Sequence, residues 1–241
     1  MAESFKNTLN AVDSLWACNS SEAVFDIVAE YGRGLGFELA IIACCCPMLM
    51  SPRKSAPFHT NCPQKWVELY AQHDFMSVDP IVQLAMRSSR PFTAKTAFAD
   101  GSKQAQAFRA AAVEHGLEFG WFIPVHIADR PSGLVGFGGA SEVQLTVFQK
   151  LESSIVGQVA YERASLYFGD IMAETEVSIS DRERAVLTLV ARGKTNWEAG
   201  AALSISEYSV RDYLKALSAK LQTSNRTHTV ARAMQLGLIA P

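Results

Sequence analysis

The sequence predicts an α+β protein with two parts, a sheet with helices on its faces followed by an all-α domain. Up to about residue 168, segments with apolar residues at helical spacing alternate with segments rich in strand formers. Residues 178–241 contain only short helical segments with capping signals at their starts. Between the two parts, Gly169 to Val177 holds three acids and has no strong period, which makes it the best linker candidate.

The composition is that of a globular protein: the chain has 241 residues, of which 49% are hydrophobic and 19% charged. The longest apolar run, Leu39 to Met50, contains Pro47 and is shorter than the roughly 20 residues that cross a bilayer. The first ten residues lack an apolar stretch behind a basic start. We therefore expect no transmembrane helix, no membrane partner, no secretory signal and a cytoplasmic location.

The two parts differ in charge. Residues 1–177 contain 13 Lys and Arg against 19 Asp and Glu, a net charge of −6, whereas residues 178–241 contain 9 against 5, a net charge of +4. A basic end on an acidic body favours contact with nucleic acid, although a charge of this size is also common on a solvated face.

The cysteines predict neither a disulfide framework nor a metal site. The five residues, Cys18, Cys44, Cys45, Cys46 and Cys62, form no CxxC pair, and no His stands at zinc spacing. In a reducing compartment we expect them to be small buried residues, three of them within one strand. No catalytic or cofactor motif is present either, so we expect neither an enzyme nor a bound cofactor.

The N-terminal part alternates between helix and strand signals. Two helices are expected between Ser4 and Gly34, with Ser20 and Ser21 capping the second one. Proline marks two later helix starts, at Pro63 and Pro80. The remaining expected elements are strands at 37–46, 121–127 and 133–139, loops at 51–60 and 73–79, and helices at 103–114 and from 143 to about 168.

The C-terminal part predicts four helices. Ser180 and Glu183 form an S-x-x-E capping box at the start of the first helix. Two short helices, 196–203 and 207–221, are separated by a turn of three residues, which is the helix-turn-helix pattern, and Ser206 caps the second. A fourth helix is expected from Thr227 to Leu236.

The second helix of such a motif enters the major groove of DNA. Its polar side carries Tyr208, Arg211, Asp212, Lys215 and Lys220. Arg211 lies one turn inside the helix, where a guanidinium reaches base edges or phosphates. Taken one at a time, each of these charges is also compatible with a plain solvent-facing role.

The pattern of residues 178–241 resembles the LuxR-type DNA-binding domain over about 60 residues. The matching segments include Ser180 to Glu183, Gly193-Lys194-Thr195, Leu203 to Ser206, Val210-Arg211 and Asn225-Arg226. The resemblance implies a four-helix domain that binds DNA as a dimer. By this resemblance the expected DNA-binding residues are Lys194, Thr195, Ser206, Tyr208, Ser209, Arg211, Lys215 and Arg226. Two departures are Tyr213, where the family often has His, and Gly200, where it usually has Ala.

The N-terminal part resembles acyl-homoserine-lactone receptors of the same family. Trp66 and Tyr70, followed by Asp79-Pro80, match a W-x3-Y…DP signature, and Gly120 to Pro124 matches a G-x-x-I-P strand. The resemblance implies an α/β/α sandwich that encloses the ligand and helps the chain dimerise. We expect residues 1–169 to form this domain, residues 170–177 the linker and residues 178–241 the DNA-binding domain.

The chemistry of these residues agrees with a ligand site. Trp66 and Tyr70 are four apart and share one helical face, where they are able to wall a cavity, although ordinary core packing gives the same spacing. The carboxylate of Asp79 is placed to accept a hydrogen bond from a ligand amide, although Asp before Pro is also a common N-cap.

Two positions depart from the receptor pattern. Cys62 stands where many relatives have Tyr, and Ala94 where they have Trp. Ala94 leaves space in the expected site, and Trp121 from the adjacent strand is a candidate to fill it.

The resemblance therefore implies a quorum-sensing regulator with an acyl-homoserine lactone as ligand. Its expected partners are double-stranded promoter DNA, a second copy of the chain and, if it activates transcription, RNA polymerase. Three alternatives remain on the same scaffold: a ligand-independent regulator, a receptor for another small molecule, and an anti-activator that sequesters a related receptor. The complete basic recognition helix argues against the last.

Overall fold

The computed structural model describes residues 2–45, 58–127, 130–168, 179–235 and 238–239. The chain divides into two compact units, Met1–Met172 and Ala173–Pro241. The expected linker at 170–177 lies outside the described residues. Within the described parts of the chain, none of the helices is both long and apolar enough to span a lipid bilayer.

A five-stranded antiparallel sheet forms the centre of the N-terminal unit. Its spatial order is β2-β1-β5-β4-β3. The strands are β1 (Leu39–Cys44), β2 (Phe58–Thr60), β3 (Phe92–Thr93), β4 (Phe119–Val125) and β5 (Gly133–Gly139). In register, Leu39 pairs with Gly138 and Cys44 with Gly133 along β1 and β5.

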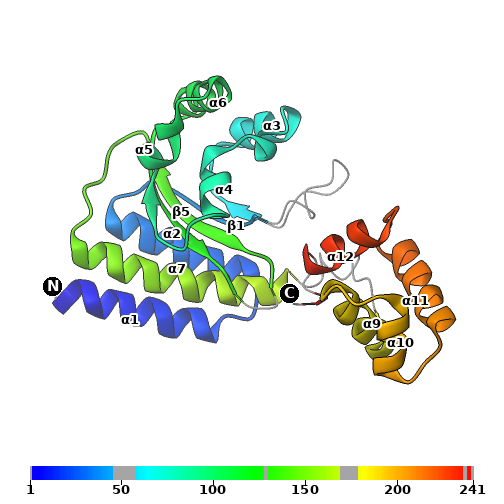
Figure 1. Ribbon diagram of the computed structural model, residues 1–241. Helices are drawn as coiled ribbons and strands as arrows, with labels where there is room; N and C mark the ends of the chain where they lie inside the picture. Colours follow the sequence, from blue (N-terminus) through cyan, green and yellow to red (C-terminus); the bar gives the residue numbers. More distant parts are fainter. Residues whose placement is uncertain (1, 46–57, 128–129, 169–178, 236–237, 240–241) are drawn as a thin grey trace. The chain divides into compact units, whose positions relative to one another are not determined.

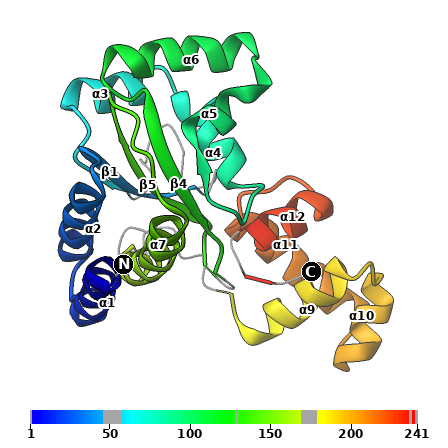
Figure 2. The same cartoon turned by 90° about the vertical axis from the view of Figure 1, so that its left-hand side faces the viewer.

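Helices cover both faces of this sheet, which confirms the predicted sandwich (Figures 1 and 2). One face packs on the three longest helices, α1 (Ala2–Ala17), α2 (Ser21–Leu35) and α7 (Val147–Tyr167). The other face carries α3 (Gln64–Gln72), α4 (Pro80–Ala85), α5 (Ala94–Ala97) and α6 (Lys103–Glu114), with the 3₁₀ turns η1 (Phe75–Ser77) and η2 (Phe98–Asp100).

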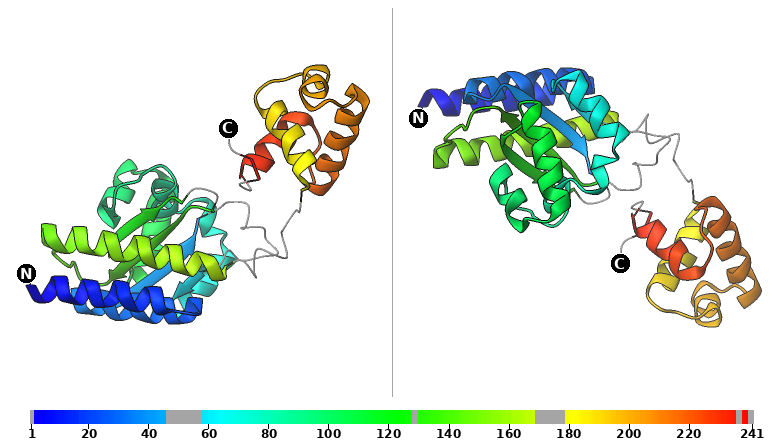
Figure 3. Two further views of the ribbon diagram at one scale, coloured as in Figure 1. Left: turned by 90° about the horizontal axis from the view of Figure 1, so that it is seen from below. Right: turned by 90° about the horizontal axis from the view of Figure 1, so that it is seen from above.

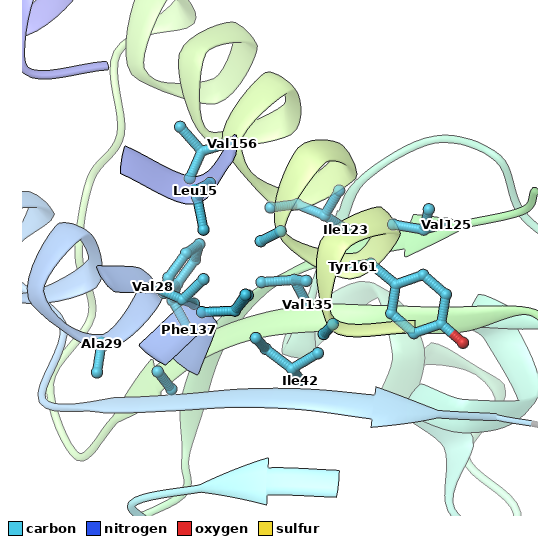
Figure 4. Packing of buried hydrophobic residues seen from close by; sticks show 14 of the residues in the cluster. Leu15, Val28, Ala29, Ile42, Ile123, Val125, Val135, Phe137, Val156 and Tyr161 are labelled. Atoms are coloured by element: carbon cyan, nitrogen blue, oxygen red, sulfur yellow. The ribbon is translucent and has the colours of Figure 1, made fainter. Parts of the chain in front are cut away.

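The hydrophobic core lies between the sheet and the three long helices. Strand residues alternate between the two faces, so Ile42, Ile123 and Val135 point toward these helices and are at most 1% exposed (Figure 4). Leu15 from α1 and Val156 from α7 complete the packing. The alternate residues of the same strands, such as Ile41, Phe122 and Leu134, point to the other face of the sheet, where they line a cavity.

The apolar residues whose helical spacing predicts α1 and α7 are only in part buried. On α1, Phe5, Leu9 and Trp16 are about half or more exposed, while Leu15 is buried. On α7, Phe148, Leu151, Ile155 and Leu166 are exposed, while the buried face carries smaller residues such as Ala160 and Ala164. The two helices lie side by side (Figure 3), and these seven exposed residues are called the outer stripe below.

Several element boundaries differ from expectation. Phe58–Thr60, expected in a loop, pairs with β1 as β2, and Phe92–Ala97 forms β3 and α5, which were not expected. The loop at 73–79 contains η1. Of the three cysteines expected within one strand, Cys44 ends β1, Cys45 follows it, and Cys46 lies outside the described residues. Cys44 and Cys45 are buried, as expected, whereas Cys18 and Cys62 are only partly buried, which corrects the expectation for these two.

The C-terminal unit has the expected four helices, α9 (Asp181–Ala191), α10 (Asn196–Leu203), α11 (Glu207–Lys220) and α12 (Arg226–Gln235). The Ser180 capping box is present, with Glu183 accepting from the backbone N–H of Ser180 at 2.8 Å. Two apolar clusters hold the helices together, with Leu187, Leu217 and Ala233 in one and Val190, Ala199 and Val210 in the other.

Candidate ligand cavity and nucleic-acid interface

A cavity of about 620 Å³ lies on the sheet face opposite the main core. This volume is within the range of small-molecule sites, and the lining is predominantly apolar. Strand residues Leu39, Ile41 and Leu134 contribute to its wall, together with residues of α3, α4, α5 and α6. The sandwich therefore encloses a space on one side and a packed core on the other.

Trp66 lies within a cluster of aromatic rings at one side of this cavity. Its ring centroid is 5.8 Å from that of Tyr70, one helical turn later, and 5.6 Å from that of Phe108 on α6. The rings of Phe75 and His115 are also within 6 Å. The residue is 7% exposed, and its indole N–H donates no hydrogen bond to any described part of the chain. This N–H is therefore available as a donor to a molecule in the cavity.

Asp79 combines the two roles that the sequence left open. One carboxylate oxygen, Oδ1, caps α4 by accepting from the N–H of Ile81 at 2.8 Å. The other, Oδ2, accepts from the hydroxyl of Tyr70 at 2.8 Å, and the residue lines the cavity. Burial raises the pKa of Asp79 to about 6, although the hydroxyl of Tyr70 and the backbone donors pull it back down.

Cys62 and Ala94, the two departures from the receptor pattern, both line the cavity. Burial raises the pKa of the Cys62 thiol, so it is a neutral apolar wall at neutral pH. Ala94 begins α5 and is 5% exposed. Both residues are therefore placed where a side-chain change alters the shape of the cavity.

Trp121 does not line the cavity, which corrects the expectation from the sequence. Its indole N–H donates to Ser153 on α7 at 3.0 Å, and the ammonium of Lys150 lies over its ring. Because side chains alternate along β4, the residue that faces the cavity is its neighbour Phe122. No aromatic ring from this strand position replaces the indole missing at Ala94.

The structure adds cavity residues that were not predicted from the sequence. Phe98, Phe108 and Phe122 supply large apolar surface, and Gly136 on β5 leaves room for the rings above it. A Cβ atom at Gly136 would lie 2.7 Å from the ring of Phe122 and 2.9 Å from Ile41. The glycines of β5 were the sequence signal for this part of the cavity, since a glycine inside a strand often marks a place where a ligand or another part of the chain approaches the backbone closely.

The charged residues among the cavity's lining are all acids. They are Glu68, Asp74 and Asp79, and no Lys, Arg or His lines the described wall. An anionic ligand therefore meets carboxylates without a compensating cation, which is unfavourable in a low-dielectric site. The cavity is suited to a neutral molecule with apolar surface.

In the C-terminal unit, α10 and α11 form the predicted helix-turn-helix. Ser204 ends α10 in the left-handed conformation (φ 55°), and Ser206 caps α11 by accepting from the N–H of Ser209 at 3.0 Å. Gly200 allows the tight turn, since a Cβ there would lie 2.8 Å from the carbonyl oxygen of Ile205. Thr195 caps α10 through a capping box with Glu198.

The outward face of α11 carries the expected recognition residues. Tyr208 is 68% exposed, and Arg211 and Lys215 are exposed on the same side, whereas Val210 and Leu217 are buried. These three exposed side chains lie on the helix face that enters the major groove in a helix-turn-helix.

Two of the expected DNA-binding cations are already engaged within the unit. The ammonium of Lys194 lies 3.1 Å from the carboxylate of Glu198. The guanidinium of Arg226 donates to the side chain of Asn196 and to the carbonyl of Lys194. Arg226 thus ties the start of α12 to the start of α10, which positions the first helix of the motif.

A predominantly apolar cavity in one unit and a helix-turn-helix in the other are the features of a ligand-responsive transcription factor. Residues 20–164 match the family described as the autoinducer binding domain, and residues 177–233 match the bacterial regulatory proteins of the luxR family. The chain belongs to the LuxR family of transcriptional regulators and carries an autoinducer binding domain.

Individual relatives agree with this assignment. The HTH-type quorum sensing-dependent transcriptional regulator RpaR of Rhodopseudomonas palustris is 31% identical over 179 residues, covering 73% of this chain and 72% of that protein. The transcriptional activator protein AhyR of Aeromonas hydrophila is 25% identical over 97% of this chain and 92% of its own length. A crystal structure of Escherichia coli SdiA has the same fold, with a TM-score of 0.74 at 23% identity over 98% of this chain and 99% of that chain.

Proposed function

We propose that this protein is a quorum-sensing regulator that binds an N-acyl homoserine lactone in the N-terminal cavity and a palindromic promoter site, as a homodimer, through the C-terminal unit. In this proposal residues 1–169 bind the ligand and dimerise, residues 170–177 link the units, and residues 178–241 bind DNA. The protein acts in the cytoplasm, and RNA polymerase is its further partner if it activates transcription.

The observation that carries the proposed ligand is the pair of polar groups in the cavity. The indole N–H of Trp66 is a donor without a partner among the described residues, and Asp79 is a buried acceptor. An N-acyl homoserine lactone is neutral. It has a carbonyl that is able to accept from the Trp66 indole, an amide N–H that is able to donate to Asp79, and an acyl chain that fits the apolar wall. The acidic lining also disfavours the ring-opened product, which is a carboxylate.

Calorimetric titration of the purified protein with lactones from butanoyl to tetradecanoyl tests the ligand. We expect saturable binding of at least one member and a ligand-dependent rise in the unfolding temperature. Mass spectrometry of small molecules released from the protein separates the alternatives. A bound molecule that is not a homoserine lactone would support the receptor for another ligand, which the departures at Cys62 and Ala94 favour.

For DNA binding, we propose that Tyr208, Ser209, Arg211 and Lys215 on α11 face the major groove. The exposure of this helix face supports the assignment. Lys194, Thr195 and Ser206 stand at or before helix starts, where side chains and free backbone N–H groups are suited to phosphates. Arg226 contributes by holding α10 in place. Gel shifts on selected promoter DNA test these roles residue by residue.

The outer stripe of α1 and α7 supports the proposed homodimer. Large apolar side chains such as Trp16 (64% exposed) and Leu151 (61% exposed) are costly to leave in water on two neighbouring helices. A second copy of the chain offers the same stripe in a twofold arrangement, so each side chain gains an apolar partner. Light scattering of the purified protein measures the oligomeric state directly.

A further inference from the structure

The hydroxyl of Tyr70 is committed to Asp79. A phenol has one proton to donate, and two acceptors lie nearby: Oδ2 of Asp79 at 2.8 Å and the thioether of Met76 at 3.5 Å. The carboxylate is closer and charged, whereas a thioether is a weak acceptor, so the proton points to Asp79. Tyr70 stays a donor over the whole physiological range, because burial and the neighbouring Asp79 raise its pKa well above the ordinary value.

The remaining acceptor capacity of Asp79 is what a ligand uses. A carboxylate offers about four lone-pair positions. Ile81 occupies Oδ1, Tyr70 occupies Oδ2, and the backbone N–H of Val82 also acts on the carboxylate, which leaves about one position for an N–H donor from the cavity. The bonds from Ile81 and Tyr70 also hold the carboxyl group against rotation, one from the start of α4 and the other from α3.

We infer that Tyr70 is a positioning residue for the ligand, whose hydroxyl keeps the buried carboxylate of Asp79 ionised and aimed at the ligand's N–H. This inference rests on the proposed function of the cavity. The inferred role differs from that of an aromatic residue that only lines the cavity. A Phe at this position would keep the ring in the cavity wall and remove only the hydroxyl donor.

Among the groups around Asp79, the Tyr70 hydroxyl has the largest effect in favour of the ionised carboxylate. Burial raises the pKa of Asp79 to about 6, and the hydrogen bond from Tyr70 is the largest influence that lowers it. The other titratable groups that line the cavity are Glu68, Asp74 and the thiols of Cys44 and Cys62, and Cys45 lies near Tyr70; no cation among the described lining residues assists. Without the Tyr70 hydroxyl, the carboxyl group takes up a proton at a higher pH.

The test is the pH dependence of lactone affinity in wild type and Tyr70→Phe between about pH 5 and pH 8. The probe is the member of the butanoyl to tetradecanoyl series that wild type binds most tightly. Wild-type affinity should be flat above about pH 7 and should fall toward tenfold per pH unit below about pH 6, because only the carboxylate accepts with full charge. In Tyr70→Phe the fall should begin at higher pH, and the loss of affinity relative to wild type should shrink toward the alkaline end.

Two variants sharpen the result. Tyr31→Phe is the matched control, because the Tyr31 hydroxyl bonds Thr8 at 3.3 Å and does not line the cavity. Its affinity profile should superimpose on that of wild type. In the Asp79→Asn background, Tyr70→Phe should have no further effect, because the group it acts on can no longer ionise. A loss of equal size at every pH, or an additive loss in the double variant, would overturn the inference.

A ligand-free measurement keeps the inference separate from the proposed ligand. Carboxyl ¹³C resonances of Asp-labelled protein, with Asp79→Asn for assignment, report the ionisation of Asp79 directly. The midpoint should lie near pH 6 in wild type and higher in Tyr70→Phe. Equal midpoints would refute the positioning role even if lactones bind. A shifted midpoint with no lactone binding at any pH would support it and refute the lactone as ligand instead.

Discussion

Replacing Asp79 by Asn should stabilise the ligand-free protein and weaken its affinity for the lactone. The pKa of Asp79 is raised from 3.8 to about 6 in the folded chain. The folded state therefore holds this proton more tightly than the unfolded state does. The associated stability is fully present below about pH 4 and is lost as the pH rises through about 6. At about 1.36 kcal/mol per pKa unit, the ionised carboxylate costs the folded protein about 3 kcal/mol at pH 7.5.

An Asn side chain avoids this cost because it carries no charge at any pH. It caps α4 as well as Asp does, so the bond from Ile81 is retained. The free energy of unfolding of Asp79→Asn, relative to wild type, should thus rise by about 2.5 kcal/mol between pH 4 and pH 7.5. Comparing the two pH values cancels contributions that do not titrate, such as an imperfect fit of the amide to Tyr70.

Urea unfolding followed by tryptophan fluorescence measures this difference, since Trp16, Trp66 and Trp121 all lie in the N-terminal unit. Ligand affinity should move the other way: loss of a charge-assisted hydrogen bond worth about 1.5–3 kcal/mol weakens lactone binding by roughly ten- to a hundredfold. A stability difference that stays constant with pH would refute the account of a desolvated carboxylate. Unchanged lactone affinity would remove Asp79 from the site.

Three further substitutions address selectivity, DNA recognition and assembly. Ala94→Trp should reduce affinity for long or bulky acyl groups more than for short ones in a calorimetric chain-length series, whereas an equal loss across the series would indicate overpacking of the fold. In gel shifts, Arg211→Ala should weaken binding to the selected operator by about 1–3 kcal/mol and reduce the base preference at one position of each half-site. Lys194→Ala should instead weaken binding to all DNA sequences alike and lower the dependence of affinity on salt concentration. Leu151→Glu should convert the proposed dimer to a monomer in light scattering. The free energy of unfolding should change by no more than about 0.5 kcal/mol, because this side chain is 61% exposed in the single chain.

Local signals were enough to predict most helix ends and part of the site. The capping residues Ser20, Ser180 and Ser206 act only on the first turn of their own helices, so their effect can be read without tertiary structure. The pair Trp66 and Tyr70 shares a face because the helical period alone places it there. The resemblance to acyl-homoserine-lactone receptors then gave Asp79 its place beside the pair.

The orientation of longer elements depends on partners far away in the chain. Trp121 and Phe122 are both large and aromatic, and only the pairing of β4 with β5 and the packing of α7 decide which of them faces the cavity. On α7, a periodic stripe such as Phe148 and Leu151 predicts a helix equally well whether it packs inside the unit or against another molecule. The short strand β2 exists because β1 offers it a free edge, which no local pattern records.

The cavity itself explains why a ligand should control this protein. An apolar space of about 620 Å³ left without contacts deprives its lining of the dispersion contacts that a packed core supplies. The ligand-free N-terminal unit must therefore fill this space with water or let α3 to α6 close over it. A neutral acyl ligand supplies the apolar contacts that the aromatic wall lacks, so it binds the open, sandwich-shaped state in preference to any collapsed one. In the proposed function, the ligand then stabilises that state by RT ln(1 + [L]/Kd), and the fraction of protein competent to dimerise and bind DNA should rise with ligand concentration.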